Sequence, residues 1–313
     1  MKYLFVVGCP RSGTTWLQML LAQHPAIATA QETHLFNGYL SELRTLWARH
    51  ADDPRGIGLQ AVYTESAFDA LCADIAARAL DQIAGMRPEA QCVLEKTPAH
   101  VRHVGTIAQL LPGAYFVHLV RDPRAVTASL TTVGRSWGAH WAAPDCAENA
   151  RRWVADVAAG RAIAGLTDRC LELRYEDLAG ADGPQALGRI VDWLGLDRPP
   201  GFEADAFDRC RIDRLREGSA DVRAPQVIAN DPAGFYGPGA STDAASRLTR
   251  RELRSVEYIC GPLMDALGYT RSSGVSPRKP ATLRLQRYVD GLEWRLQHWQ
   301  KRLFRSLRHR IRH

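Results

Sequence analysis

A candidate anion-binding turn lies at residues 8–15, with the sequence GCPRSGTT. Gly8 and Gly13 have the G-x-x-x-x-G spacing of a phosphate-cradling loop, in which backbone N–H groups and the dipole of the following helix favour an anion. In a P-loop nucleoside triphosphatase, Lys follows the second glycine, but Thr14 stands there in this chain. The positive charge comes instead from Arg11, whose guanidinium can form forked hydrogen bonds to phosphate or sulfate oxygens. This exchange disfavours magnesium-dependent phosphoryl transfer.

The longer string PRSGTTWL, at residues 10–17, closely resembles the 5′-phosphosulfate-binding loop of sulfotransferases that use 3′-phosphoadenosine 5′-phosphosulfate (PAPS). Members of that family carry Lys or Arg at the position of Arg11. The resemblance implies that PAPS is the cosubstrate and that Arg11 contacts its phosphosulfate during transfer. The other residues of the string that it assigns to PAPS binding are Ser12, Gly13, Thr14, Thr15 and Trp16.

A second stretch, FVHLVRDPRAVTASL at residues 116–130, resembles the 3′-phosphate-binding strand and helix of the same family. The resemblance implies that Arg121, at the end of the strand, and Ser129, eight residues later, bind the 3′-phosphate. The residue types fit, because Pro123 suits the first position of a helix and Ser129 then lies about two turns further along. The alternative is an exposed Arg121 paired with Asp122.

The EKTP sequence at residues 95–98 resembles an element of carbohydrate-type sulfotransferases in which the Lys faces the acceptor and the sulfuryl group. Lys96 is therefore expected to contact the transition state, where positioned cations stabilise the charge that spreads over the transferring group. The alternative is a surface ion pair between Glu95 and Lys96.

A third stretch, LRYEDL at residues 173–178, resembles the family segment that ends a core strand on the nucleotide side of the fold. It adds Tyr175 to the candidates for donor binding, with structural packing as the alternative. Asp177 can cap the turn that follows.

The general base is expected in the string QETHLF, which holds Glu32 and His34. An acceptor hydroxyl must lose its proton as it attacks sulfur, so a base has to lie near the phosphosulfate. In carbohydrate, tyrosyl and many bacterial sulfotransferases a Glu at this location is the base, and the string matches that pattern, so Glu32 is favoured and His34 is the rival. His100 and His103 are further alternatives, whereas His118 lies within an apolar strand and is expected to be packed.

Alternating strand and helix patterns must position these residues. Short apolar runs at residues 3–7, 26–30, 92–94, 114–120 and 170–173 predict strands, and the spacing of apolar residues over 14–23 predicts a helix. Repetition of strand and helix favours an α/β fold with a parallel sheet. We therefore expect a P-loop-like three-layer fold, a central parallel sheet flanked by helices on both faces.

The domain boundaries follow from where this alternation is interrupted. We expect one sulfotransferase domain over residues 1–270, with acceptor-side insertions at 38–88 and 198–245 and a last helix at 248–267. Residues 271–280 read as a linker. Many relatives close the 3′-phosphate pocket with a basic loop before the last helix, but YGPGASTD stands there, at residues 236–243. Arg223 or Arg247 could supply the missing cation.

The C-terminal segment, residues 281–313, is expected to form a basic amphipathic helix. Residues 278–313 hold 11 Lys and Arg against two acidic residues, a balance of +9, whereas the total of +6 leaves −3 for the rest. The helix could lie on an anionic membrane surface, pair with another subunit in a homo-oligomer, or remain a disordered basic end. Nucleic acid is not expected as a partner, because no recognition motif accompanies the charge.

Composition bounds the location and the cofactors. The seven cysteines are scattered without a metal-binding spacing, so we expect reduced thiols and no metal site. No apolar run approaches the roughly 18 residues that a membrane span needs, and residues 1–8 are too short for a signal peptide. We therefore expect a cytoplasmic protein, with peripheral attachment to the inner face of the membrane left open by the tail.

The leading functional hypothesis is a sulfotransferase that moves the sulfuryl group of PAPS, by in-line displacement, to a hydroxyl of a sugar, a lipid or a secondary metabolite. A peptide tyrosine is a further possible acceptor, and the sequence does not choose among them. The enzyme alternative is a P-loop kinase that uses ATP. The non-enzyme alternative is a membrane-associated protein that binds the nucleotide without turnover.

Overall fold

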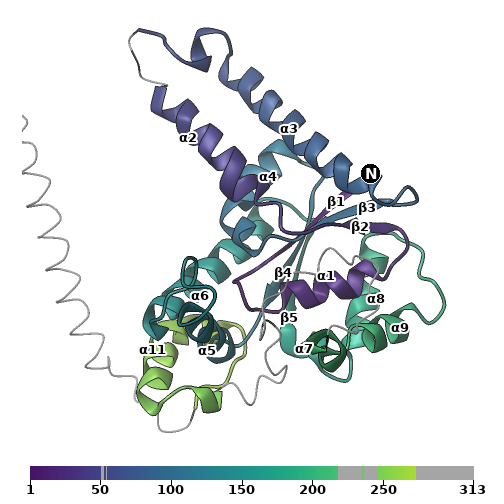
Figure 1. Cartoon of the computed structure of the whole chain (residues 1–313), viewed down its shortest axis with the longest axis vertical. Helices are drawn as coiled ribbons and strands as arrows, with labels where there is room; N and C mark the ends of the chain where they lie inside the picture. The colour runs from purple at the N-terminus through teal and green to yellow at the C-terminus, as the bar shows by residue number, and fades with distance from the viewer. Residues whose placement is uncertain (51–52, 54, 218–234, 236–244, 273–313) are drawn as a thin grey trace, which may run out of the picture.

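The computed structural model describes residues 1–50, 53, 55–217, 235 and 245–272. Five parallel strands form one sheet in the order β2-β3-β1-β4-β5 (Figure 1). The strands are β1 (Lys2–Val7), β2 (Ile27–Thr29), β3 (Cys92–Glu95), β4 (Tyr115–Val120) and β5 (Cys170–Arg174). The expected strands and their parallel arrangement are confirmed.

Helices follow the strands along the chain. They are α1 (Thr14–Ala22), α2 (Ser41–His50), α3 (Glu65–Gly85), α4 (Val104–Leu110), α5 (Pro123–Gly134), α6 (Cys146–Arg161), α7 (Tyr175–Ala179), α8 (Gly183–Trp193), α9 (Phe202–Arg209), α10 (Ile212–Arg216) and α11 (Arg250–Ala266). A π-helical turn, η1 (Leu35–Leu40), and a 3-10 segment, η3 (Pro98–His103), come directly after site motifs. Helices α1 and α11 match the helices expected from apolar spacing.

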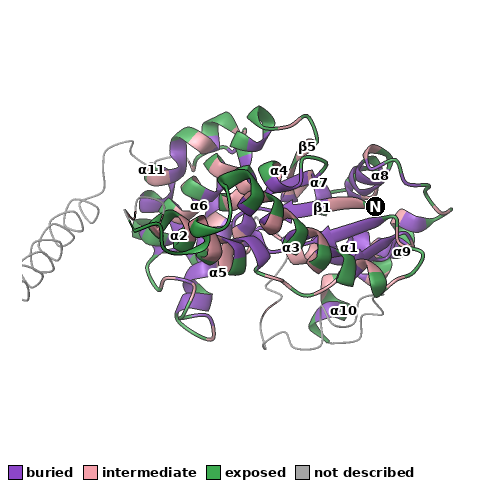
Figure 2. Cartoon of the chain, turned by 90° about the horizontal axis from the view of Figure 1, so that it is seen from above, coloured by how far each residue is buried: buried purple, intermediate pink, exposed green. Residues whose placement is uncertain are grey.

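The central strand β1 shows why helices cover both faces of the sheet. Its side chains alternate with a period of two: Leu4 and Val6 pack in one cluster with α1, α8 and α9, whereas Phe5 and Val7 pack in another with α3 and α4. Figure 1 shows these two groups of helices on opposite sides of the strands. In Figure 2 the middle of the sheet is buried and the outer faces of the helices are exposed, whereas no residue of the edge strand β5 is buried. The predicted three-layer fold is therefore confirmed.

A third apolar cluster joins α5, α6 and α11 beside the end of β4. At its centre, Trp153 of α6 is fully buried, and its indole Nε1 donates a hydrogen bond to the carbonyl oxygen of Arg121 at 3.0 Å. This hydrogen bond anchors the backbone that follows β4. The side chain of Asp122 then caps α5, because it accepts a hydrogen bond from the Arg124 amide at 2.8 Å.

Much of the segment at 38–88 is helical, and one face of α3 belongs to the core. Phe68, Cys72, Ala76 and Leu80 of α3 are buried against the sheet, while Ile75 is exposed. Helix α2 and the start of α3 extend away from the sheet (Figure 1). Where they meet, Trp47 and Phe68 stack with ring centroids 4.1 Å apart.

Parts of the expected organisation fall outside the described residues. These are the basic helix at 281–313, nearly all of the linker at 271–280, and the loop at 236–243. Within the described part of the chain, no helix has the length and apolar character needed to cross a membrane. The same part contains six buried cysteines and a half-buried Cys170, all of them free thiols.

Candidate active site

A cavity of about 650 Å³ lies beyond the carboxyl ends of the central strands, where ligands bind in open α/β sheets. It collects most of the residues that the separate sequence motifs proposed. These lining residues are Arg11, Gly13, Thr14, Thr15, Trp16, Glu32, His34, Arg121, Ser129, Tyr175 and Arg247. Ser12 and Lys96 are buried beside it and do not line it. Arg223 lies outside the described residues.

The turn at residues 8–15 has the strained backbone of a ligand-binding loop. Arg11 adopts a left-handed conformation with φ of 74°, which is uncommon for a residue with a side chain. Gly13 has φ of 96°, and a Cβ atom there would lie 2.5 Å from the ring of Tyr175. No side chain caps the start of α1, and its first turn carries no acidic residue. The helix N-terminus is therefore suited to an anionic ligand.

Arg11 and Ser129 meet in the cavity although they are 118 residues apart in the sequence. The Nε of Arg11 donates to the Oγ of Ser129 at 3.0 Å. Its Nη2 donates to the carbonyl oxygen of Phe235, and the guanidinium lies 4.8 Å from the centroid of the Phe235 ring. The cation of the first motif and the serine of the second thus share one binding region.

Arg121 lies on the same side of the cavity. Its guanidinium carbon is 4.0 Å from the centroid of the Tyr175 ring, and its Nη1 lies 3.4 Å from the carbonyl oxygen of Arg11. Burial raises the pKa of Tyr175, so its hydroxyl stays neutral. The carboxylate of Asp122 binds Arg124, with Oδ2 and Nη2 2.6 Å apart.

The two favoured candidate bases are neighbours. One carboxylate oxygen of Glu32 lies 2.5 Å from the Nζ of Lys96, and the other lies 3.7 Å from the Nε2 of His34. Lys96 is only 3% exposed, so the alternative of a surface ion pair with Glu95 is wrong. Glu32 and His34 both border the cavity, so geometry alone leaves the choice of base open.

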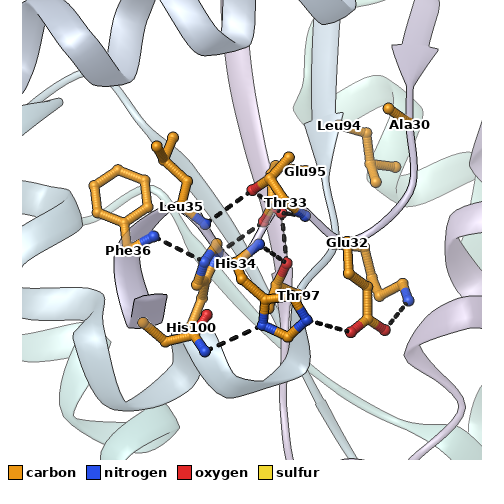
Figure 3. A network of polar contacts seen from close by, with 12 residues as sticks. Ala30, Glu32, Thr33, His34, Leu35, Phe36, Leu94, Glu95, Thr97 and His100 are labelled. Atoms are coloured by element: carbon orange, nitrogen blue, oxygen red, sulfur yellow. Dashed lines mark hydrogen bonds and ion pairs between the residues drawn. The ribbon is translucent and has the colours of Figure 1, made fainter. Parts of the chain in front are cut away.

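The other three histidines considered from the sequence, His100, His103 and His118, do not line the cavity. His100 is fully buried; its Nδ1 is 2.8 Å from Glu95, and its Nε2 accepts from the Phe36 amide at 3.1 Å (Figure 3). Both ring nitrogens are therefore occupied. His118 is buried and lies 3.2 Å from Glu172, as expected for a packed residue. Burial lowers the pKa of His103, which does not line the cavity.

The carboxylate of Glu95 joins Thr33, Thr97 and His100 in the network drawn in Figure 3. Burial alone would raise the pKa of its carboxyl group, but His100 and the hydroxyl groups of Thr97 and Thr33 outweigh burial and hold this pKa at about 2. The carboxylate is therefore ionised at neutral pH although it is 2% exposed.

One wall of the cavity was missed from the sequence. Trp137, His140 and Trp141 line it from the segment after α5, and Arg152 lines it from α6. Nη1 of Arg152 donates to the carbonyl oxygen of Trp141 at 2.7 Å, and its guanidinium lies 5.9 Å from the centroid of the Trp141 ring. The signal was the sequence SWGAHW, which places two large aromatic side chains in a short connection between helices.

The described residues that line the cavity include four arginines and one carboxylate. Across the described residues, no group of three His, Cys, Asp or Glu side chains is arranged to hold a metal ion. The lining side chains Arg11, Arg121, Arg152 and Arg247 give the cavity an excess of positive charge over Glu32. Such a cavity favours a ligand with several negative charges.

Comparisons with known proteins identify the family. A model described as the sulfotransferase family matches residues 4–200. Protein-tyrosine sulfotransferase 2 of Gallus gallus is 26% identical over 201 residues, which is 63% of this chain and 52% of that protein, so the chain spans about half the length of this relative. The nodulation protein NoeE of Sinorhizobium fredii is 26% identical over 93% of this chain and 73% of its own.

Solved structures show the same fold. Mouse sulfotransferase SULT7A1, complexed with PAP, aligns over 84% of this chain and 85% of its own, with a TM-score of 0.53 and 15% identity. A sulfotransferase domain from the curacin biosynthetic pathway aligns over 84% of this chain and 97% of its own, with a TM-score of 0.52 and 17% identity. By its sequence match and its fold, the chain belongs to the sulfotransferase family.

Proposed function

We propose that this protein transfers the sulfuryl group of PAPS to a hydroxyl group of an acceptor. The observation that carries the proposal is the contact between Arg11 and Ser129, 3.0 Å apart. It joins a loop suited to a phosphosulfate with a helix suited to a second phosphate, in one cavity. A ligand with anionic groups at both ends of a nucleoside fits that arrangement, and one solved relative is described as complexed with PAP.

The donor side would divide its cations between the two ends of PAPS. The start of α1, with Ser12 to Thr15 and Arg11, would bind the 5′-phosphosulfate through backbone N–H groups and the guanidinium. Arg121 and Ser129 would bind the 3′-phosphate. Arg247 lines the cavity from the exposed start of the last helical region and would replace the basic loop that many relatives carry.

Glu32 would accept the proton of the acceptor hydroxyl as its oxygen bonds to sulfur and the bond from sulfur to the 5′-phosphate oxygen breaks, which releases adenosine 3′,5′-bisphosphate. Lys96, 2.5 Å from Glu32, would turn toward the transferring group and stabilise its charge. His34 is the rival base, since its Nε2 lies 3.7 Å from Glu32.

The wall formed by Trp137, His140 and Trp141 would hold the acceptor, next to Asn37 and Pro98. Indole rings present flat apolar faces and suit a ring-bearing acceptor such as a sugar or a secondary metabolite. A lipid or a peptide tyrosine would use the same hydroxyl chemistry, and one relative is named a protein-tyrosine sulfotransferase. Analysis of the sulfated product will identify the acceptor class.

Calorimetry separates this function from the alternatives. Adenosine 3′,5′-bisphosphate should bind without metal and at least about tenfold more tightly than AMP, because only this donor class uses Arg121 and Ser129. Equal affinity for AMP would contradict the proposal. Tight binding of ATP that requires magnesium would favour a kinase, and binding of the bisphosphate without turnover of PAPS would favour a nucleotide-binding protein.

For the tail at residues 281–313, we propose attachment to an anionic membrane surface from the cytoplasmic side. Its charge supports the proposal, since residues 278–313 carry a balance of +9. Removing residues 278–313 should abolish sedimentation with anionic liposomes. Conversion of an oligomer to a monomer, with liposome binding unchanged, would favour pairing between subunits instead.

A further inference from the structure

Glu95 is a buried charged residue that the proposed reaction does not use. Its side chain does not line the cavity. It is hydrogen-bonded to Thr33, within residues 31–36, which we call the base segment, and to Thr97 and His100, which in turn contact that segment (Figure 3). Placing a charge in the interior costs free energy unless it is hydrogen-bonded, so the position of this carboxylate calls for a reason.

Four donors converge on the carboxylate of Glu95. Oε1 accepts from the hydroxyl of Thr97 at 2.7 Å, from the hydroxyl of Thr33 at 2.9 Å and from the backbone N–H of Thr33 at 3.3 Å. Oε2 lies 2.8 Å from Nδ1 of His100. Because an ionised carboxylate is an acceptor only, it orients both hydroxyl hydrogens and the ring hydrogen toward itself.

That orientation leaves the outer lone pairs of the same three side chains free to accept. The Thr97 hydroxyl accepts from the His34 amide at 3.3 Å, the Thr33 hydroxyl from the Leu35 amide at 3.1 Å, and Nε2 of His100 from the Phe36 amide at 3.1 Å. Together with the Thr33 amide on Glu95 itself, four successive backbone N–H groups are held by one carboxylate and its partners.

The base segment needs such support because its backbone is irregular. His34 has φ of 51°, a left-handed conformation that is costly for a residue with a side chain, and the π-helical turn η1 begins at Leu35. The first amides of a helical turn have no partner within it. The network supplies those partners, and the resulting conformation places Glu32 between Lys96 and His34.

We propose that Glu95 is a positioning residue: its ionised carboxylate fixes the base segment so that Glu32 faces the reacting group. This inference rests on the proposed function. The isosteric Glu95→Gln change tests it, since a glutamine amide offers one acceptor oxygen and one donor group. The glutamine side chain can accept hydrogen bonds from the two threonine hydroxyls or from His100, but it cannot accept from all three groups.

The first measurement is amide hydrogen exchange of the full chain saturated with adenosine 3′,5′-bisphosphate. In Glu95→Gln, the amides of residues 33–36 should exchange at least about tenfold faster than in the wild type. The matched control is Glu257→Gln, which alters a carboxylate that is 1% exposed and bonded to Arg124 and to the Ser272 amide, away from the cavity. That variant should leave exchange at 33–36 unchanged.

The second measurement separates positioning from folding. Transfer of a labelled sulfuryl group from PAPS to acceptors in a lysate of the source organism should fall about 10²-fold in Glu95→Gln. The affinity for adenosine 3′,5′-bisphosphate should stay within about twofold, because the donor contacts lie elsewhere. A parallel loss of donor affinity, or a transfer rate equal to that of Glu257→Gln, would overturn the positioning role while leaving the sulfotransferase proposal standing.

A milder variant covers the case in which Glu95→Gln fails to fold. Thr33→Val removes the hydroxyl that links Glu95 to the Leu35 amide but keeps the backbone contact of residue 33. It should show the same two effects at smaller size, with local exchange and transfer changed together. Faster exchange with a full transfer rate would contradict the inference. If the wild type itself fails to prefer the bisphosphate over AMP, the proposed function fails first.

Discussion

The donor turn, residues 8–15, and the base segment, residues 31–36, differ in what their backbone N–H groups bind. Each contains a non-glycine residue in the left-handed region, Arg11 with φ of 74° and His34 with φ of 51°. At the donor turn, no side chain caps the helix that follows, which leaves its first amides for a ligand. In the base segment, four successive amides are consumed by Glu95 and its partners.

The difference separates two ways to build a site. In the donor turn, glycines and a helix start leave backbone N–H groups for the proposed anionic ligand. In the base segment, other side chains hold the backbone, and of residues 31–36 only Glu32 and His34 line the cavity. The donor turn is specified by local sequence, whereas the base segment depends on Glu95, more than 60 residues along the chain.

The largest expected effect comes from removing the proposed base, Glu32. Glu32→Gln should lower kcat by about 10²- to 10⁴-fold, because the acceptor hydroxyl loses its proton acceptor. Binding of adenosine 3′,5′-bisphosphate should change little, since Glu32 lies in the base segment and not in the donor turn. Single-turnover transfer and calorimetry measure the two quantities separately. Unchanged turnover would move the role of base to His34.

The next effect is on stability and depends on pH. Glu95 has a pKa of about 2 in the folded chain, below the ordinary value of 4.5, so ionisation stabilises the fold above about pH 4.5. That stabilisation, on the order of 3 kcal/mol, is lost as the pH falls toward 2. The gap in unfolding free energy between wild type and Glu95→Gln should therefore shrink between pH 5 and pH 3, as measured by urea unfolding. A constant gap would argue against an ionised Glu95.

Adding one methyl group at Gly13 should strain the donor turn and weaken binding of the donor. In Gly13→Ala, the new Cβ would lie 2.5 Å from the Tyr175 ring on a backbone with φ of 96°. Strain of about 1–3 kcal/mol should weaken bisphosphate binding by about 10- to 100-fold. Gly105→Ala in α4 is the matched control, because nothing lies within 4 Å of its added Cβ. Equal affinities in the two variants would show that the turn does not bind the donor.

The smallest expected effect concerns the 3′-phosphate. Arg121→Ala should reduce the preference for adenosine 3′,5′-bisphosphate over AMP by about tenfold, through loss of a charge-assisted hydrogen bond. Arg247→Ala tests whether that residue supplies the second cation, and a comparable loss would support it. If neither change alters the preference measured by calorimetry, the 3′-phosphate lies elsewhere.

Sequence patterns predict the fold, and they identify the turn at residues 8–15, because both depend on short-range order. Most of the strands are short apolar runs, and the turn is a continuous string from Gly8 to Thr15. The sequence does not predict the buried network, because for Glu95 it suggests only a surface ion pair with Lys96. Its role depends on Thr33 and His100, which reach it through strand pairing and a 3-10 segment. The wall at Trp137 and Trp141 was missed because a short connection carries no periodic signal.

Transfer of label from PAPS tests the central claim most directly. The full chain, with PAPS labelled in its sulfuryl group, acceptors from a lysate of the source organism and a metal chelator, should move label into a product. The amount should equal the adenosine 3′,5′-bisphosphate formed, and Glu32→Gln should form almost none. Label that stays on the donor, or a modification that appears only with ATP and magnesium, would contradict the account.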